Sequence, residues 1–276
     1  MHKLILLFTI LVIFSGCTKS NKFYSGYIDA DLTYLSSDFS GQLLSLQVAR
    51  GEYVNKQKLL FKLEQLNETR NINSGLQNQI DLTAERDQLL SKLNYAKINY
   101  NRQNKLNKTG AGSQDAFDQA KQNLDVLLYQ INSINAQIKN NEILTAQKIW
   151  QKERKQNVAP ESGIVYDTYF TIGEYVQGGQ PILSLITKKN IKAIFFVSEA
   201  DLGKIKLNQN VIISTDGNNS HYQGIISYIS NQAEYTPPII YSREERQKLV
   251  FKIEMRIVNA DLNQIHLGQP VTVEIK

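Results

Sequence analysis

The chain has 276 residues, 42% of them hydrophobic, and a formal net charge of +5. This length is enough for about one to three small domains, and the hydrophobic share is ordinary for a folded protein. Lys and Arg are spread along the whole chain and interleaved with Asp and Glu, which indicates solvated faces and argues against a nucleic-acid-binding surface.

The first residues have the layout of a signal peptide. A basic start precedes the apolar run 4–14, which is too short for a bilayer that needs ~20 apolar residues. The run ends in Phe14-Ser15-Gly16-Cys17, which resembles a bacterial lipobox with Phe14 in place of the usual Leu. We therefore expect a lipoprotein signal peptide over 1–16, lipid attachment at Cys17 and a polar tether over 17–22. A plain cleaved signal with an incidental cysteine, or an uncleaved anchor, would fit the same pattern.

Residues 23–40 alternate loosely and predict one or two strands that join the β-domains.

A short passage then occurs twice, at 41–64 and 163–186. When Gly41 is superposed on Gly163, the run Gly51-Glu52-Tyr53-Val54 aligns with Gly173-Glu174-Tyr175-Val176. Each copy has the pattern of a strand, a Gly-Glu turn with positive φ at Gly51 or Gly173, and an alternating strand. Neither copy could bury its apolar face alone. We expect the halves 41–63 and 159–187 to form one β-sandwich, from which everything between them projects.

The insertion at 64–158 predicts a helical hairpin. Residues 64–108 contain no proline and one glycine, Gly75, which favours a long helix. The stretch 113–157 carries a heptad seam. The seam consists of Phe117, Ala120, Leu124, Leu127, Ile131, Ile134 and Ile138. Its partner in the first stretch is a less regular stripe, interrupted by Arg86, that consists of Leu82, Leu89, Leu93, Ala96 and Tyr100. Two glycines in Thr109-Gly110-Ala111-Gly112 can form the turn, and Ser113 can cap the next helix. The tip of this antiparallel coiled coil is expected near 107–113.

After the second half the pattern becomes all-β. Strand candidates lie at 191–197, 211–213, 222–229 and 249–257. They predict a β-barrel over 188–235, followed by a membrane-proximal or barrel-completing β-region over 236–276. The predicted fold is therefore elongated and mixed α and β.

These residues carry a family resemblance over nearly the whole mature chain. The motif of Gly163, Val165, Gly173, Glu174, Val176 and Gln180-Pro181-Ile182-Leu183, with a helical hairpin between two lipoyl-like half-domains, resembles the HlyD family of periplasmic adaptors, or membrane fusion proteins. The segment 233–251 resembles the branch that serves ABC-type exporters. The resemblance implies a homo-oligomer, with a hexamer usual in the family, that joins an inner-membrane transporter to an outer-membrane channel. It also implies the periplasm of a Gram-negative bacterium as the location.

Three residues flanking the predicted tip match the family's docking pattern for TolC-type channels: Arg102, Leu106 and Ser113. Arg102 and Ser113 could hydrogen-bond the backbone at a channel mouth, and Leu106 could fill an apolar notch. Alternatively, Arg102 is a solvated residue, Leu106 ends the seam and Ser113 is only a helix cap.

Three other function classes were weighed against an adaptor. A biotinyl-lipoyl carrier needs a lysine at the turn that joins the two halves, and here the helical insertion replaces that turn. An enzyme is disfavoured because His2, His221 and His266 lie far apart and no nucleophile, phosphate-loop or metal-ligand motif is present. We therefore expect no catalytic residue, metal or cofactor. A lipid-anchored structural clamp of the envelope, without a transport role, would not need the spacing of Arg102, Leu106 and Ser113.

Overall fold

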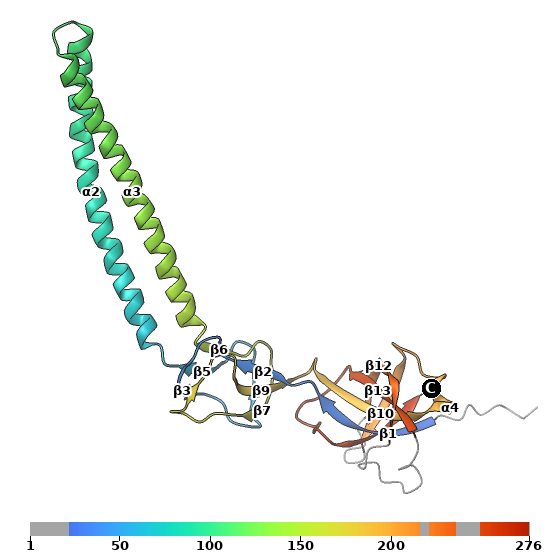
Figure 1. Ribbon diagram of the computed structural model, residues 1–276. Coiled ribbons are helices and arrows are strands. Elements are labelled where there is room, and N and C mark those ends of the chain that lie inside the picture. The colour runs from blue at the N-terminus through green and yellow to red at the C-terminus, as the bar shows by residue number, and fades with distance from the viewer. Residues whose placement is uncertain (1–21, 216–220, 236–248, 276) are drawn as a thin grey trace, which may run out of the picture.

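The computed structural model describes residues 22–215, 221–235 and 249–275. In that part of the chain, a long helical hairpin, a β-sandwich and a β-barrel follow one another in an elongated arrangement (Figure 1). The predicted elongated mixed α and β fold with a projecting helical hairpin is confirmed. The expected signal peptide (1–16) lies outside the described residues, and so do Cys17 and the rest of the tether except residue 22. Residues 236–248, in the segment 233–251 that resembles the ABC-exporter branch, also lie outside them.

The sandwich contains two four-stranded sheets, with the strand orders β2-β9-β7-β4 and β6-β5-β3-β8. The strands are β2 (Thr33–Ser36), β3 (Gly41–Leu46), β4 (Tyr53–Val54), β5 (Leu59–Leu63), β6 (Gln156–Val158), β7 (Gly163–Thr168), β8 (Tyr175–Val176) and β9 (Pro181–Thr187). The two sequence copies exchange strands, because β4 of the first copy pairs with β7 and β8 of the second pairs with β3. Neither copy can therefore complete its sheet without the other.

The inward-facing residues of both sheets form one apolar core. Its fully buried members include Leu43, Phe61, Leu63, Val165 and Leu185. They come from alternating positions of strands in both copies, as expected when successive side chains of a strand point to opposite faces. Burial of each such Leu or Phe contributes about 1.5–3 kcal/mol, so the core holds the two copies together.

The barrel is a closed sheet of six strands in the order β1-β10-β13-β12-β11-β14. Its elements are β1 (Lys22–Ala30), β10 (Ile191–Ser198), α4 (Glu199–Leu202), β11 (Asn210–Thr215), β12 (His221–Tyr235), β13 (Leu249–Ile257) and β14 (Pro270–Ile275). Buried side chains such as Phe195, Ile213, Ile226 and Met255 fill its interior.

The strand pairing of the barrel draws on both ends of the described chain. The segment 23–40 supplies β1 to the barrel and β2 to the sandwich, and of the two alternatives for 236–276 the described strands there, β13 and β14, take the barrel-completing one. A sheet closes only when both of its edges find partners. Here β14 provides the closure, because it pairs with β1 on one side and with β11 on the other.

The hairpin consists of α2 (Leu66–Lys108) and α3 (Gln114–Glu153), which run antiparallel. Residues of the expected heptad seam face the partner helix. Those buried below a tenth of their surface are Leu93, Ala96, Ala120, Leu127, Ile131 and Ile134. Toward the sandwich the seam becomes polar: the buried Asn141 donates to the Gly75 carbonyl and to Gln79 Oε1, each at 2.9 Å, and accepts from Asn78.

Candidate docking site at the hairpin tip

The tip is a Schellman turn that ends α2. The Gly110 N–H donates to the Asn107 carbonyl at 3.1 Å, and the Ala111 N–H donates to the Leu106 carbonyl at 3.0 Å. Gly110 has φ of +73°, the left-handed conformation that this motif needs after the cap residue Thr109. These bonds satisfy two of the four carbonyls that a helix end leaves without a partner in the helix, which makes the tip a defined structure.

The structure brings Arg102, Leu106 and Ser113 together at this end of the hairpin. Arg102 and Leu106 are four residues apart, so they share one face of the last turns of α2. Ser113 stands across the turn as the residue that precedes α3. All three are solvent-exposed, and Leu106 retains 38% of its surface.

The polar side chains of this triad are unused within the described part of the chain. Ser113 has the extended backbone of an N-cap residue, with φ −81° and ψ 137°, but its hydroxyl makes no capping hydrogen bond. The Arg102 guanidinium likewise has no partner among the described residues. The Ser113 hydroxyl and the Arg102 donors therefore remain available to an external acceptor, such as a backbone carbonyl.

Contacts that the sequence did not reveal hold Leu106 and the tip in place. Gly112 packs so closely on Leu106 that an added Cβ would lie 2.9 Å from the Leu106 Cβ. Asn107 donates to Gln114 Oε1 at 3.0 Å across the turn. One layer below, the rings of Tyr100 and Phe117 lie 5.6 Å apart. Of these features, the glycine at 112 and the placement of Tyr100 and Phe117 on facing stripes of the seam could be found from the sequence, whereas the Asn107–Gln114 hydrogen bond could not.

A buried ion pair joins the other end of the hairpin to the sandwich. Lys155 Nζ lies 2.8 Å from Glu68 Oε1 and donates to the Glu64 carbonyl at 3.1 Å. Burial opposes ionisation of Glu68, but the hydrogen bond and positive charge of Lys155 outweigh it and lower the Glu68 pKa. Among the described residues, the buried Glu68 Oε2 has no hydrogen-bond partner, so this carboxylate depends strongly on Lys155.

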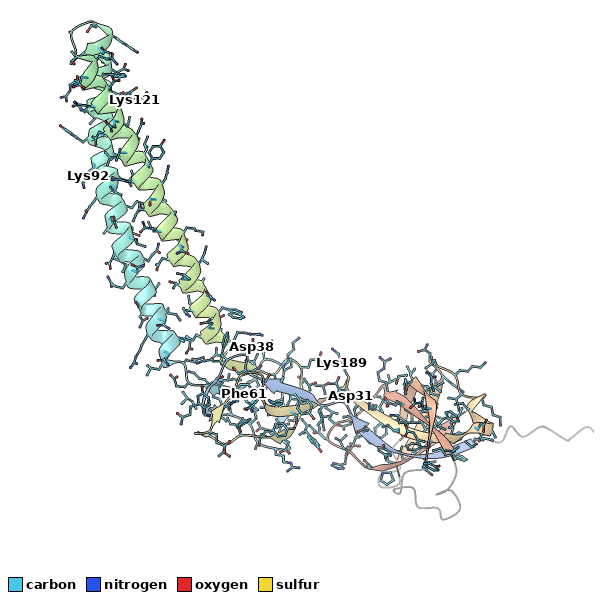
Figure 2. The ribbon with its side chains drawn as sticks, in the orientation of Figure 1. Asp31, Asp38, Phe61, Lys92, Lys121 and Lys189 are labelled. Atoms are coloured by element: carbon cyan, nitrogen blue, oxygen red, sulfur yellow. The ribbon has the colours of Figure 1, made fainter. Side chains whose placement is uncertain are left out.

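An exposed cluster beside this pair connects α3 to the first sandwich strands. Trp150 meets Phe39 edge-to-face at 5.6 Å, and the Arg154 guanidinium lies 5.9 Å from the centre of the Trp150 ring. Arg154 also pairs with Asp38, which lies near the hairpin base in Figure 2. Together with the Lys155–Glu68 pair, these contacts fix the direction in which the hairpin leaves the sandwich.

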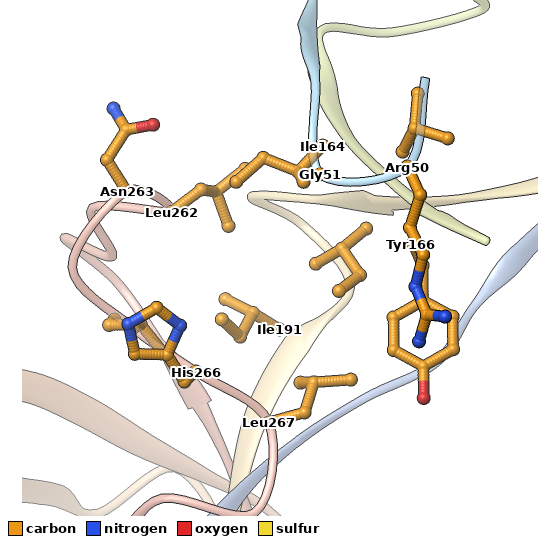
Figure 3. Close-up of a pocket in the computed structure, with 12 residues that line it drawn as sticks. Arg50, Gly51, Ile164, Tyr166, Ile191, Leu262, Asn263, His266 and Leu267 are labelled. Carbon is orange, nitrogen blue, oxygen red and sulfur yellow. The ribbon is translucent and has the colours of Figure 1, made fainter. Parts of the chain in front are cut away.

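A pocket of about 510 Å³ lies between the sandwich and the barrel (Figure 3). Arg50, Gly51 and Tyr166 line it from the sandwich, and Leu262 and His266 line it from the barrel. His266 lines this pocket. His221, the first residue of β12, instead forms a hydrogen bond with Ser214. Within the described ranges, no group of three or more His, Cys, Asp or Glu side chains could hold a metal ion.

The repeat glycines lie in the sandwich, away from the tip. Gly51 and Gly173 occupy the turns, with φ of +83° and +99°, and Gly41 and Gly163 begin β3 and β7.

Cys17 lies outside the described residues. No helix in the described part of the chain has both the length and the hydropathy needed to cross a bilayer.

Comparison with known proteins gives curated relatives that are similar in sequence over part of their length. No family model matches the chain. A membrane protein of Acidithiobacillus ferridurans, encoded in the asrC 5′ region, is 30% identical over 118 residues, or 42% of this chain and 35% of the relative. The macrolide export protein MacA of Escherichia coli O157:H7 is 28% identical over 221 residues, or 78% of this chain and 60% of MacA. The chain thus spans only part of the length of these curated relatives.

Solved structures share the fold. The crystal structure of MacA from Actinobacillus actinomycetemcomitans matches with a TM-score of 0.75 and 20% identity, covering 93% of this chain and 78% of that one. The membrane fusion protein Spr0693 from Streptococcus pneumoniae R6 matches with a TM-score of 0.60 and 15% identity, covering 92% of this chain and 98% of that one. The chain is thus similar in sequence to a macrolide export protein over most of its own length, and it shares the fold of a solved MacA structure and a solved membrane fusion protein.

Proposed function

We propose that this protein is a periplasmic adaptor that links an inner-membrane ABC exporter to a TolC-type outer-membrane channel. The observation that carries the proposal is the tip, where Arg102, Leu106 and Ser113 are exposed and the two polar side chains lack partners among the described residues. The relative named for macrolide export supports a role in export. Lipid at Cys17 would hold the chain at a membrane in the periplasm of a Gram-negative bacterium.

In the proposed mechanism this chain performs no chemistry and needs no cofactor. Arg102 and Ser113 would donate hydrogen bonds to the channel mouth, and Leu106 would enter an apolar notch. Each contact is small, but several copies acting together multiply the effective affinity, which suits a joint that opens and closes. The contacts at the hairpin base, including the Lys155–Glu68 pair, would keep the tip pointed at the channel.

The partner at the tip can be identified by crosslinking in cells with a photoreactive residue at the exposed Thr109. We expect the probe to capture an outer-membrane channel protein. The same probe at Lys92, an exposed position on the side of α2, should not capture it. Capture of only this protein, or of an unrelated envelope protein, would contradict the adaptor role and favour the structural clamp.

Substitutions at the tip test the role of each side chain. Leu106→Ser or Arg102→Asp should abolish export and leave the thermal unfolding curve nearly unchanged, because both residues are exposed. Leu76→Ser is a matched control, since Leu76 is also an exposed leucine of α2 but lies far from the tip. A tip variant that loses stability together with export would show a structural role instead.

The lipid anchor is tested separately by Cys17→Ser. This variant should lose lipid labelling and should not mature normally. Normal maturation of the variant would remove lipidation from the proposal and leave the docking role untouched.

A further inference from the structure

The barrel wall of the pocket between sandwich and barrel is held firmly in place. Leu262 and Ile265 are 4% and 6% exposed and anchor the loop 258–269 in the barrel core. The Gly268 N–H donates to the Ile28 carbonyl at 2.8 Å, which ties the end of this loop to β1. The wall is therefore preformed, as it is in most small-molecule sites.

The sandwich wall is fixed by backbone hydrogen bonds. The Gly51 N–H donates to the Val165 carbonyl at 2.8 Å, and the Val165 N–H donates to the Glu52 carbonyl at 2.9 Å. These bonds hold Arg50 beside β7, whose Tyr166 lines the same pocket. A guanidinium and a phenol are thus placed on one wall.

The middle of the pocket is apolar. Ile164 and Ile186 of the sandwich are half-buried and pack against the barrel core, as does the half-buried Leu267. Ile191, the first residue of β10, is only 1% exposed. In Figure 3, Ile191 and Leu267 lie in the centre of the pocket. These side chains offer a surface on which a hydrocarbon or aromatic body would be removed from water.

Polar side chains flank this apolar centre on two sides. Figure 3 shows Arg50 and Tyr166 on one side of it and Asn263 and His266 on the other. The Tyr166 hydroxyl and the His266 imidazole have no hydrogen-bond partner among the described residues, and both can donate. No Asp or Glu of the described chain lines the pocket. The lining therefore favours an anion over a cation.

The charge of Arg50 is only weakly engaged inside the chain. Its Nε lies 3.9 Å from Asp167 Oδ1, and the two side chains are 69% and 33% exposed. So long and exposed an ion pair contributes little. Asp167 Oδ1 also accepts from the Thr168 N–H at 2.9 Å. The outer N–H groups of Arg50 can therefore bind a second anion, and a guanidinium does so with two parallel hydrogen bonds.

We propose that this pocket binds an amphipathic organic anion. Its apolar or aromatic body lies on Ile191 and Leu267, and its carboxylate, sulfonate or phosphate accepts hydrogen bonds from Arg50. The volume of about 510 Å³ is within the range of ~300–1,000 Å³ that is usual for such sites. Because both domains line the site, the bound anion also favours one position of the sandwich relative to the barrel. The inference goes beyond the proposed function, because linking a transporter to a channel needs no small-molecule site.

The test is isothermal titration calorimetry of the full-length chain in lipid nanodiscs, with empty nanodiscs as the blank. The probe is naphthalene-2-sulfonate, and naphthalene-2-sulfonamide is its neutral counterpart with the same ring system. We expect one sulfonate to bind per chain with a Kd below about 1 mM. The sulfonamide should bind at least about tenfold more weakly, because it lacks the charge that Arg50 pairs with.

Substitutions near the guanidinium should change the affinity in opposite directions. Arg50→Gln should weaken sulfonate binding about tenfold and leave sulfonamide binding unchanged. Asp167→Asn should tighten sulfonate binding about twofold to fivefold, because it removes the carboxylate that competes for Arg50. Arg70→Gln is the matched control: it removes the same charge from an exposed arginine of α2 that does not line the pocket, and it should bind like the unaltered chain.

Hydrogen exchange locates the bound probe. The sulfonate should slow exchange in both walls, at 50–53 and at 262–267, and the same protection should be absent in Arg50→Gln. The proposal would be overturned by equal affinity for sulfonate and sulfonamide, by equal losses in Arg50→Gln and Arg70→Gln, or by protection in one domain only. Absence of binding above the nanodisc blank would overturn it as well.

Discussion

Gly51 and Gly173 hold equivalent places in the two halves of the sandwich and tie each half to the other. Gly51 has φ of +83° and Gly173 has φ of +99°. The Gly51 N–H donates to the Val165 carbonyl in the second copy, and the Gly173 N–H donates to the Leu43 carbonyl in the first, each at 2.8 Å. The repeated Gly-Glu pair is thus the point at which the two copies cross.

Replacement of either turn glycine by alanine should destabilise the protein to a similar extent. A left-handed conformation costs an L-residue about 1–2 kcal/mol, and no neighbouring atom crowds the new Cβ at either site. Urea unfolding of Gly51→Ala and Gly173→Ala should show this loss. Gly203→Ala is the control, because Gly203 has φ of −63° and open space around it. An equal loss in the control would contradict the backbone explanation.

The other repeated pair of glycines should respond unequally. A Cβ on Gly163 would lie inside the contact distance of the Ile186 carbonyl oxygen, which belongs to the adjacent backbone. A Cβ on Gly41 would lie 3.4 Å from the Leu63 Cβ, an ordinary contact. Gly163→Ala should therefore cost about 1–3 kcal/mol by overpacking, while Gly41→Ala stays near neutral. Thermal unfolding of the two variants measures the difference, and equal melting temperatures would show that the backbone around Gly163 yields.

Gly75 and Thr145 mark a close approach of α2 and α3 near the hairpin base. A Cβ on Gly75 would collide with the Thr145 hydroxyl oxygen. Gly75→Ala should therefore destabilise the hairpin, although alanine favours a helix interior by about 1 kcal/mol over glycine. In a Thr145→Ala background the collision disappears, and the same substitution should become stabilising. Helix unfolding followed by circular dichroism tests this change of sign, and destabilisation in both backgrounds would refute it.

The free energy of unfolding should fall more when one partner of the Lys155–Glu68 pair is removed than when both are replaced by apolar residues. The two side chains are only 8% and 15% exposed, so Lys155→Met would leave a buried carboxylate unpaired, at a cost on the order of 3 kcal/mol. Glu68→Leu combined with Lys155→Met should recover most of this loss in urea unfolding. A double variant no more stable than Lys155→Met would contradict the explanation.

The same pair predicts weakening in acid. The Glu68 pKa is lowered in the folded state from its usual value of 4.5. The unfolded chain therefore binds the proton more readily, and the stability that Glu68 contributes is present above about pH 4.5 and lost as pH falls through the lower folded pKa. Unfolding measured from pH 6 downward should show a smaller acid loss in the Glu68→Leu and Lys155→Met double variant.

Periodic features made the sandwich and the hairpin predictable from the sequence. The repeated Gly-Glu turns and the heptads each recur at a fixed spacing, so local patterns were sufficient. The barrel closure depends on pairing between β1 and β14, which come from the two ends of the described chain, and no local pattern encodes that partner. Likewise, no local pattern predicts that Glu68 pairs with Lys155, because the two residues lie far apart in the sequence. At the tip, the spacing of Arg102, Leu106 and Ser113 could be read directly, but the packing of Gly112 on Leu106 and the unused Ser113 hydroxyl depend on the geometry of the turn.

The contact between Gly112 and Leu106 offers a test of the tip that leaves the side chains proposed to dock unchanged. Gly112→Ala would put a Cβ 2.9 Å from the Leu106 Cβ and 3.1 Å from the Asn107 nitrogen, so Leu106 must shift. We expect export to fall about as far as in Leu106→Ser, because a docking residue is effective only in its correct position. Urea unfolding should change by less than about 0.5 kcal/mol, since the turn lies at the exposed end of the hairpin.

Gly110→Ala is the control for this variant, because it strains the turn at φ of +73° without adding an atom near Leu106. Hydrogen exchange should become faster at the turn in this control, while most of the export activity remains. If Gly112→Ala exports normally, the position of Leu106 does not limit docking, and the channel contact must depend mainly on the exposed Arg102 and Ser113 side chains.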